Sequence, residues 1–149
     1  DWQSIIKFFI MFPLYTVAIN TSGTGEWISN LIQTSFPMLN NAVVLATAFC
    51  IVSMICTQFM NNTAVWAVFS PIAAVMAINL NMDPRLVVAG VATGALICFA
   101  TPMAAVAGAY TYGICNFNMK EYIKLGWIPC ILMTIAFVIW APIVLNIIY

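Results

Sequence analysis

Residues 57–63 read Thr-Gln-Phe-Met-Asn-Asn-Thr, a polar cluster inside a charge-free run that extends from Trp27 to Met82. Two apolar arms, 42–58 and 64–80, surround the centre of this cluster. An amide or hydroxyl group in hydrocarbon is costly unless it finds a hydrogen-bond partner. The cluster is therefore either a turn at the membrane surface between two full spans, or the tip of a re-entrant hairpin that binds a ligand at membrane depth.

The length of the arms permits both interpretations, because each is close to the length of one membrane span. Two features favour the re-entrant hairpin. The tip contains no Lys or Arg, although it would be a cytoplasmic loop if the arms were two spans. Large apolar residues also stand beside it, and we expect them to press against it: Phe59, Met60, Val65 and Trp66.

The composition identifies a membrane protein. The chain is 64% hydrophobic and 5% charged, whereas a soluble domain has about 25% charged residues. The eight charged residues stand at the edges of apolar stretches: Asp1, Lys7, Glu26, Asp83, Arg85, Lys120, Glu121 and Lys124. A membrane helix needs about 20 apolar residues, so the stretches between these charges predict an all-α protein with four or five membrane-inserted elements.

The composition also excludes several functions. The chain has no His, and no acidic residue lies within an apolar stretch. General acid–base catalysis, an activated nucleophile and most metal sites therefore lack their side chains, and we predict that the protein is not an enzyme. The net charge is zero without a basic patch, which argues against nucleic acid as a partner. The five cysteines form no Cys-x-x-Cys pair and are expected to be buried apolar residues.

Residues that break helices mark the boundaries of the predicted elements. Proline, glycine and asparagine separate the apolar segments. An amphipathic stretch that is too short to span the membrane follows the first apolar segment. The expected elements are a transmembrane helix at 5–21, an interfacial helix at 26–36, a re-entrant hairpin at 42–80 with its tip at 61–63, a discontinuous transmembrane helix at 84–115 and a transmembrane helix at 125–148. Because the chain opens on Asp1-Trp2 at the edge of a span, we expect it to be the C-terminal repeat of a larger protein, preceded by an N-terminal repeat.

A second interruption lies at 100–108, where Thr101-Pro102 and Gly108 break an apolar run. It is either a proline kink in a continuous helix or a discontinuous helix whose unwound carbonyls face a cavity. A hairpin tip followed by a broken helix is how several transporter folds build a midplane site. Carbonyl, Asn and Thr oxygens bind a cation there, and half-helix N-termini face an anion.

The basic residues predict the orientation. Lys7, Lys120 and Lys124 fall on one side of the membrane if the elements alternate, and Arg85 falls on the other. The positive-inside rule then places the three lysines in the cytoplasm and the C-terminus outside, in the plasma (inner) membrane.

The order of these features resembles the divalent anion:sodium symporter family, within the ion transporter superfamily. That family has a Ser-Asn-Thr motif at each of two hairpin tips. Residues 59–64, Phe-Met-Asn-Asn-Thr-Ala, look like the second tip, with Pro71 in the following arm. Asp83-Pro84, the segment 119–126 and the opening Trp2 are also similar to the family.

The resemblance implies a site and a mechanism. The implied sodium (Na+) ligands are Thr57, Asn62 and a backbone carbonyl near Ala104, and the implied substrate-binding residues are Asn61, Asn62, Thr63, Ala105 and Gly108. It implies a sodium-coupled symporter of a small anion, with di- and monocarboxylates among the candidates. The complete protein would be a homodimer in the lipid bilayer that works as an elevator, with the N-terminal repeat supplying the other half of the site.

The sequence departs from the family pattern in two places. Asn61 stands where the family has Ser, and 105–108 reads Ala-Val-Ala-Gly where the family has Thr-Pro-Pro-Asn. Thr101 and Pro102 match that motif only if the register slips by four residues. In the gapless register the side chains that would face a dicarboxylate are replaced. Two alternative functions remain: a sodium-independent anion channel or permease, and a structural membrane subunit without a site.

Overall fold

The computed structural model describes residues 41–115 and 118–148 continuously, together with isolated positions between 6 and 34. The continuous ranges contain α3 (Ala42–Thr57), α4 (Asn62–Asn79), α5 (Pro84–Leu96), α6 (Val106–Ile114) and α7 (Met119–Ile148). No strand occurs in these ranges, which confirms the all-helical class. The helices predicted at 5–21 and 26–36 lie outside the continuously described residues.

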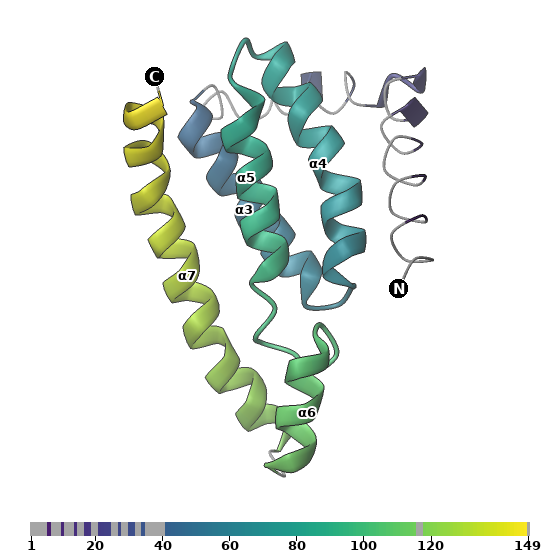
Figure 1. Cartoon of the computed structure of the whole chain (residues 1–149), viewed down its shortest axis with the longest axis vertical. Helices are drawn as coiled ribbons and strands as arrows, with labels where there is room; N and C mark the ends of the chain where they lie inside the picture. Colours follow the sequence, from purple (N-terminus) through teal and green to yellow (C-terminus); the bar gives the residue numbers. More distant parts are fainter. Residues whose placement is uncertain are drawn as a thin grey trace.

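Helices α3 and α4 form an antiparallel hairpin, and α5 runs back along it (Figure 1). The hairpin turn is short because Asn61 caps α4: its side-chain oxygen accepts a hydrogen bond of 2.9 Å from the Thr63 amide. Asp83 caps α5 in the same way, accepting a bond of 2.7 Å from the Arg85 amide, and Pro84 occupies the first helical position. Both caps are local signals that the sequence carries.

Helices α3 and α5 pack backbone to backbone. A Cβ atom added to Gly90 would overlap the carbonyl oxygen of Ala46, and one added to Gly94 would overlap that of Cys50. The two glycines are one turn apart on α5, so they form a single smooth contact face. Small residues of this kind allow membrane helices to approach closely. This contact fixes α5 against the hairpin arm that leads to the polar cluster.

Helix α7 lies alongside α3 and α5, on the side away from α4 (Figure 1). It buries only a narrow stripe that includes Gly126, Cys130, Phe137 and Ala141. Most of its other apolar side chains are exposed, as expected for a helix that faces lipid. By length and composition, Asn62–Asn79 and Met119–Ile143 are the two described helices suited to cross a membrane.

Helix α7 begins earlier than the apolar pattern predicts. The expected span starts at residue 125, whereas the helix starts at Met119 and includes Lys120, Glu121 and Lys124. These residues are good helix formers, and a Glu in the first turn interacts favourably with the helix dipole. The hydrophobic run therefore marks the membrane segment, and the helix extends beyond it.

The hairpin is much shorter than α7. Its 16-residue α3 rises about 24 Å at 1.5 Å per residue, whereas the 30-residue α7 rises about 45 Å. Figure 1 shows the α3–α4 turn part-way along α7, at the level where the chain between α5 and α6 is not helical. The polar cluster and the interrupted helix thus meet at one level of the molecule.

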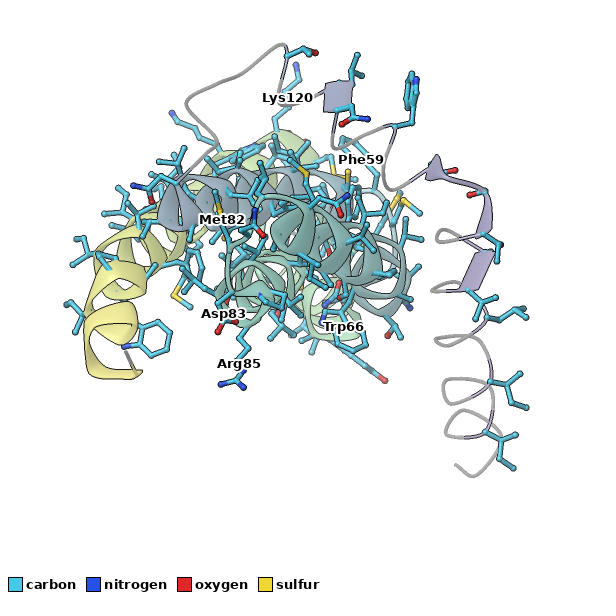
Figure 2. The ribbon with its side chains drawn as sticks, turned by 90° about the horizontal axis from the view of Figure 1, so that it is seen from above. Phe59, Trp66, Met82, Asp83, Arg85 and Lys120 are labelled. Atoms are coloured by element: carbon cyan, nitrogen blue, oxygen red, sulfur yellow. The ribbon has the colours of Figure 1, made fainter. Side chains whose placement is uncertain are left out.

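The large residues around the turn do not all pack against it, which corrects the expectation from the sequence. Val65 is buried and Trp66 is half-buried, but Phe59 is 83% exposed and Met60 is 49% exposed. Phe59 and Trp66 lie on opposite sides of the helix cluster (Figure 2). The turn is held by polar contacts instead.

Candidate functional site

Gln58 joins the hairpin turn to the interruption between α5 and α6. Its side-chain amide Nε2 donates to the carbonyl oxygens of Ile97 at 2.7 Å and Met54 at 2.9 Å. Its Oε1 accepts a bond of 3.0 Å from the Ala100 amide, and the Thr101 hydroxyl donates to its backbone carbonyl. Gln58 is 3% exposed. Because a helix end leaves backbone groups unpaired, this one side chain replaces bonds that the interruption of α5 removes.

Three oxygen atoms converge beside Gln58. The Thr57 hydroxyl lies 2.9 Å from Asn62 Oδ1 and 2.9 Å from the carbonyl oxygen of Ala95. They come from the last turn of α3, the first turn of α4 and the last turn of α5. A hydroxyl has a single proton, so Thr57 donates to one of these oxygens at a time. The cluster therefore has spare lone pairs in a site where Thr57 is fully buried.

The side chain of Asn62 is oriented by a cysteine. Its Nδ2 lies 3.3 Å from Cys98 Sγ, in the segment that follows α5. With the nitrogen engaged there, the amide oxygen faces Thr57. The partner of this nitrogen is therefore a thiol and not a carbonyl. A neutral thiol is a weak acceptor, so it orients the amide without adding charge.

The candidate residues separate into two groups. Thr57 and Asn62 lie together, and Thr101 joins the same junction through Gln58. Ala104 is buried within the interruption, and no hydrogen bond between its carbonyl and this cluster occurs among the described residues. Its role as a sodium ligand stays a prediction.

The remaining candidates lie at two helix starts. Asn61 caps α4, and Thr63 is exposed in its first turn. Ala105 is the N-cap of α6 and makes no side-chain capping bond to the first amides of this helix. Gly108 lies in the first turn of α6, because the non-helical segment ends at Ala105 and not at residue 108. Pro102 packs close to Gly108: a Cβ on this glycine would lie 3.5 Å from the Pro102 Cα.

An open, mainly apolar hollow adjoins the start of α6. Its volume is about 430 Å³. The residues that line it come from the interruption, from α6 and from the start of α7: Pro102, Met103, Ala105, Ala109, Tyr112 and Met119. The start of α6 therefore opens onto space large enough for a small solute.

Sequence reasoning missed four members of this site. The carbonyls of Ala95 and Ile97 carry no sequence signal, because every residue has a carbonyl. Cys98 was assigned with the other cysteines to the buried apolar residues. Gln58 did carry a signal, because a buried amide beside Thr57 must find partners for both of its ends. The interruption of α5 is the element able to supply them.

The oxygen set suits a hard cation. Hydroxyl, amide and backbone carbonyl oxygens are ligands for hard metal ions, and membrane transporters bind Na+ with unwound carbonyls and helix C-terminal ends. No group of three or more His, Cys, Asp or Glu able to hold a metal ion occurs among the described residues. The geometry thus favours an alkali cation over a transition metal.

The comparison with protein families decides the class of protein to which the chain belongs. The model of the sodium:sulfate symporter transmembrane region matches residues 1–147. The chain belongs to this family. The match confirms the resemblance to the divalent anion:sodium symporters. The chain is therefore part of an integral membrane protein that transports anions coupled to sodium. The family is one of transporters and not of enzymes. No curated protein matches the chain.

Proposed function

We propose that the chain forms one half of the transport site of a sodium-coupled symporter, with Na+ bound by Thr57, Asn62 and the carbonyl of Ala95. The observation that carries this proposal is the approach of Asn62 Oδ1 and the Ala95 carbonyl to within 2.9 Å of the Thr57 hydroxyl. These atoms lie where the hairpin turn meets the interrupted helix. Ala104 remains a candidate for a further ligand in the bound state.

Electrostatics support Na+ as the coupling ion at this site. The three ligands are neutral, and Ala95 lies in the last turn of α5, where the helix dipole contributes about half a negative charge. This partial charge favours a cation without requiring a carboxylate. Coupling to protons would require a group that titrates near neutral pH, and hydroxyl, amide and carbonyl groups do not.

A re-entrant hairpin is part of the proposal. Helix α3, at about 24 Å for its 16 residues, and α4, at about 27 Å for its 18 residues, are both shorter than the hydrocarbon core of about 30 Å. The base of the hairpin lies at the end of the molecule where α7 terminates, opposite the end where α7 begins (Figure 1). With Lys120 and Lys124 in the cytoplasm, the hairpin enters from outside and the C-terminus is external. We place the protein in the plasma (inner) membrane.

The substrate proposed here is a compact oxyanion such as sulfate. The α6 start has no side-chain cap and opens onto the hollow, so its amides and helix dipole can receive an anion. At 105–108 the anchors are backbone N–H groups, because Ala and Gly occupy positions where the resemblance implies polar side chains. A tetrahedral oxyanion needs only such donors, whereas a dicarboxylate needs donors at both ends. Asn61 and Thr63 at the α4 start would complete the shell.

The remaining architecture follows from the family resemblance. We propose that an N-terminal repeat supplies a second hairpin and the other half of the site. The complete transporter would be a homodimer that carries its site across the membrane as an elevator. The contacts of Gln58 support such a motion, because they tie the hairpin turn and the interrupted helix into one unit.

The test is uptake into proteoliposomes that contain the full-length protein. Labelled sulfate should accumulate when a sodium gradient is applied, and a potassium or proton gradient of equal size should not replace it. Unlabelled succinate should compete more weakly than unlabelled thiosulfate. Sodium-independent sulfate flux would indicate a channel or permease instead, and strong competition by succinate would contradict the proposed substrate.

A further inference from the structure

Helix α7 contacts the interruption backbone to backbone at a glycine. A Cβ atom on Gly126 would overlap the carbonyl oxygen of Phe99 and would lie 2.7 Å from the Ala100 Cα. Both of these are backbone atoms, so a rotamer change cannot relieve the overlap. The same Ala100 donates its amide proton to Gln58. The backbone of α7 is thus in direct contact with the segment that Gln58 holds.

The same face of α7 continues this contact over two more turns. Cys130 is fully buried and belongs to one apolar cluster with Ile97, Ala100 and Met54. Thr134 lies one turn further, and its hydroxyl is 3.3 Å from the sulfur of Met54. Met54 is the residue whose carbonyl accepts a hydrogen bond from Gln58. Helix α7 therefore supports both backbone segments that Gln58 connects.

We propose that Gly126 is a positioning residue for the sodium site. It lets α7 hold Phe99 and Ala100 in place, so that Gln58 keeps the end of α5 docked on the hairpin and the Ala95 carbonyl stays next to Thr57. This inference rests on the proposed function. Gly126 itself contacts neither the ion nor the oxygen atoms that bind it.

The size of the effect follows from the distances. An ordinary Cβ contact is at least 3.4 Å, so alanine at 126 requires α7 and Ala100 to separate by about 0.7 Å, and the closer carbonyl oxygen of Phe99 requires more. Where Ala100 takes up this separation by moving away from Gln58, their bond of 3.0 Å exceeds hydrogen-bonding distance. Loss of one such bond corresponds to about a three- to tenfold weaker affinity.

The experiment measures sulfate uptake against sodium concentration in the full-length protein. Gly126→Ala should raise the half-saturating sodium concentration about three- to tenfold, with the maximal rate per folded transporter changed less than about twofold. Gly113→Ala is the matched control, because a Cβ there meets nothing within 4 Å, and it should behave as wild type.

Cys130→Val is the second variant if Gly126→Ala does not reach the membrane. The larger side chain presses on the same cluster with Ala100 and should raise the half-saturating sodium concentration as well. Wild-type sodium dependence in Gly126→Ala, or in Cys130→Val when the first variant does not fold, would overturn the inference. A shift of the same size in Gly113→Ala would overturn it too. Failure of the proposed function looks different, because the wild-type protein itself would then transport without sodium.

Discussion

Replacing Gln58 by leucine removes the connection between the hairpin turn and the interrupted helix while keeping the volume of the side chain similar. The variant loses three side-chain hydrogen bonds, to Ile97, Met54 and Ala100. Ile97 and Ala100 are each 1% exposed, so the freed carbonyl and amide have little access to water. Each buried polar group left unpaired costs about 1–3 kcal/mol. The two unpaired groups therefore destabilise the docked segment by at least about 2 kcal/mol. We use about 3 kcal/mol, because partial relaxation of the segment lowers the upper end of the range.

This cost should appear in the sodium affinity. In Gln58→Leu the end of α5 can leave the hairpin, and binding of Na+ must bring the Ala95 carbonyl back to Thr57. A re-docking cost of about 3 kcal/mol corresponds to about a 100-fold higher half-saturating sodium concentration.

The assay is sodium-dependent sulfate uptake, with the amount of folded transporter measured by size-exclusion chromatography. Asn79→Ala is the control, because Asn79 is an exposed amide at the far end of α4, and it should keep the wild-type sodium dependence. A Gln58→Leu protein with wild-type sodium dependence would refute the reasoning, because it would show that these bonds do not position the site.

Two further predictions concern the neighbours of Asn62. Cys98→Val should raise the half-saturating sodium concentration about threefold, because the Asn62 amide loses the acceptor that orients it. Cys98→Ser keeps an acceptor and should retain the wild-type sodium dependence. Equal effects in both variants would contradict this role of Cys98. Asn61→Cys, in a protein without its native cysteines, should react with a membrane-impermeant thiol reagent from outside, and Na+ should slow the reaction; labelling only from the cytoplasm would contradict the re-entrant hairpin.

The sequence was informative where residue type alone sets the local structure. Asn61 and Asp83 are good helix caps, and both start helices here. Thr57 and Asn62 flank the turn between two apolar arms, so their proximity follows from a short connection. Pro102 predicts an interruption because it cannot donate a backbone hydrogen bond. The interrupted segment lies at 97–105, three residues before the predicted range, because Gln58 supplies partners for its freed groups.

The sequence could not predict contacts made by backbone atoms. Nothing distinguishes the carbonyl of Ala95 from any other carbonyl, and Gly126 lies within an ordinary apolar span. Their roles depend on how α3, α5 and α7 pack, which no local pattern encodes. The prediction that Phe59 and Met60 pack against the turn was wrong for a related reason. Large apolar residues next to a polar turn can instead face lipid or another part of the protein, and both side chains are exposed here.

The most direct test of the central claim is the binding of radioactive ²²Na+ to the purified full-length protein carrying Asn62→Ala. Thr57 keeps the Ala95 carbonyl as a hydrogen-bond partner in this variant, so the protein should fold. Asn79→Ala is the matched control, because Asn79 is exposed at the other end of the same helix. We predict that Asn62→Ala loses saturable ²²Na+ binding and sodium-driven sulfate uptake, while Asn79→Ala keeps both. Wild-type ²²Na+ binding by folded Asn62→Ala would contradict the sodium site.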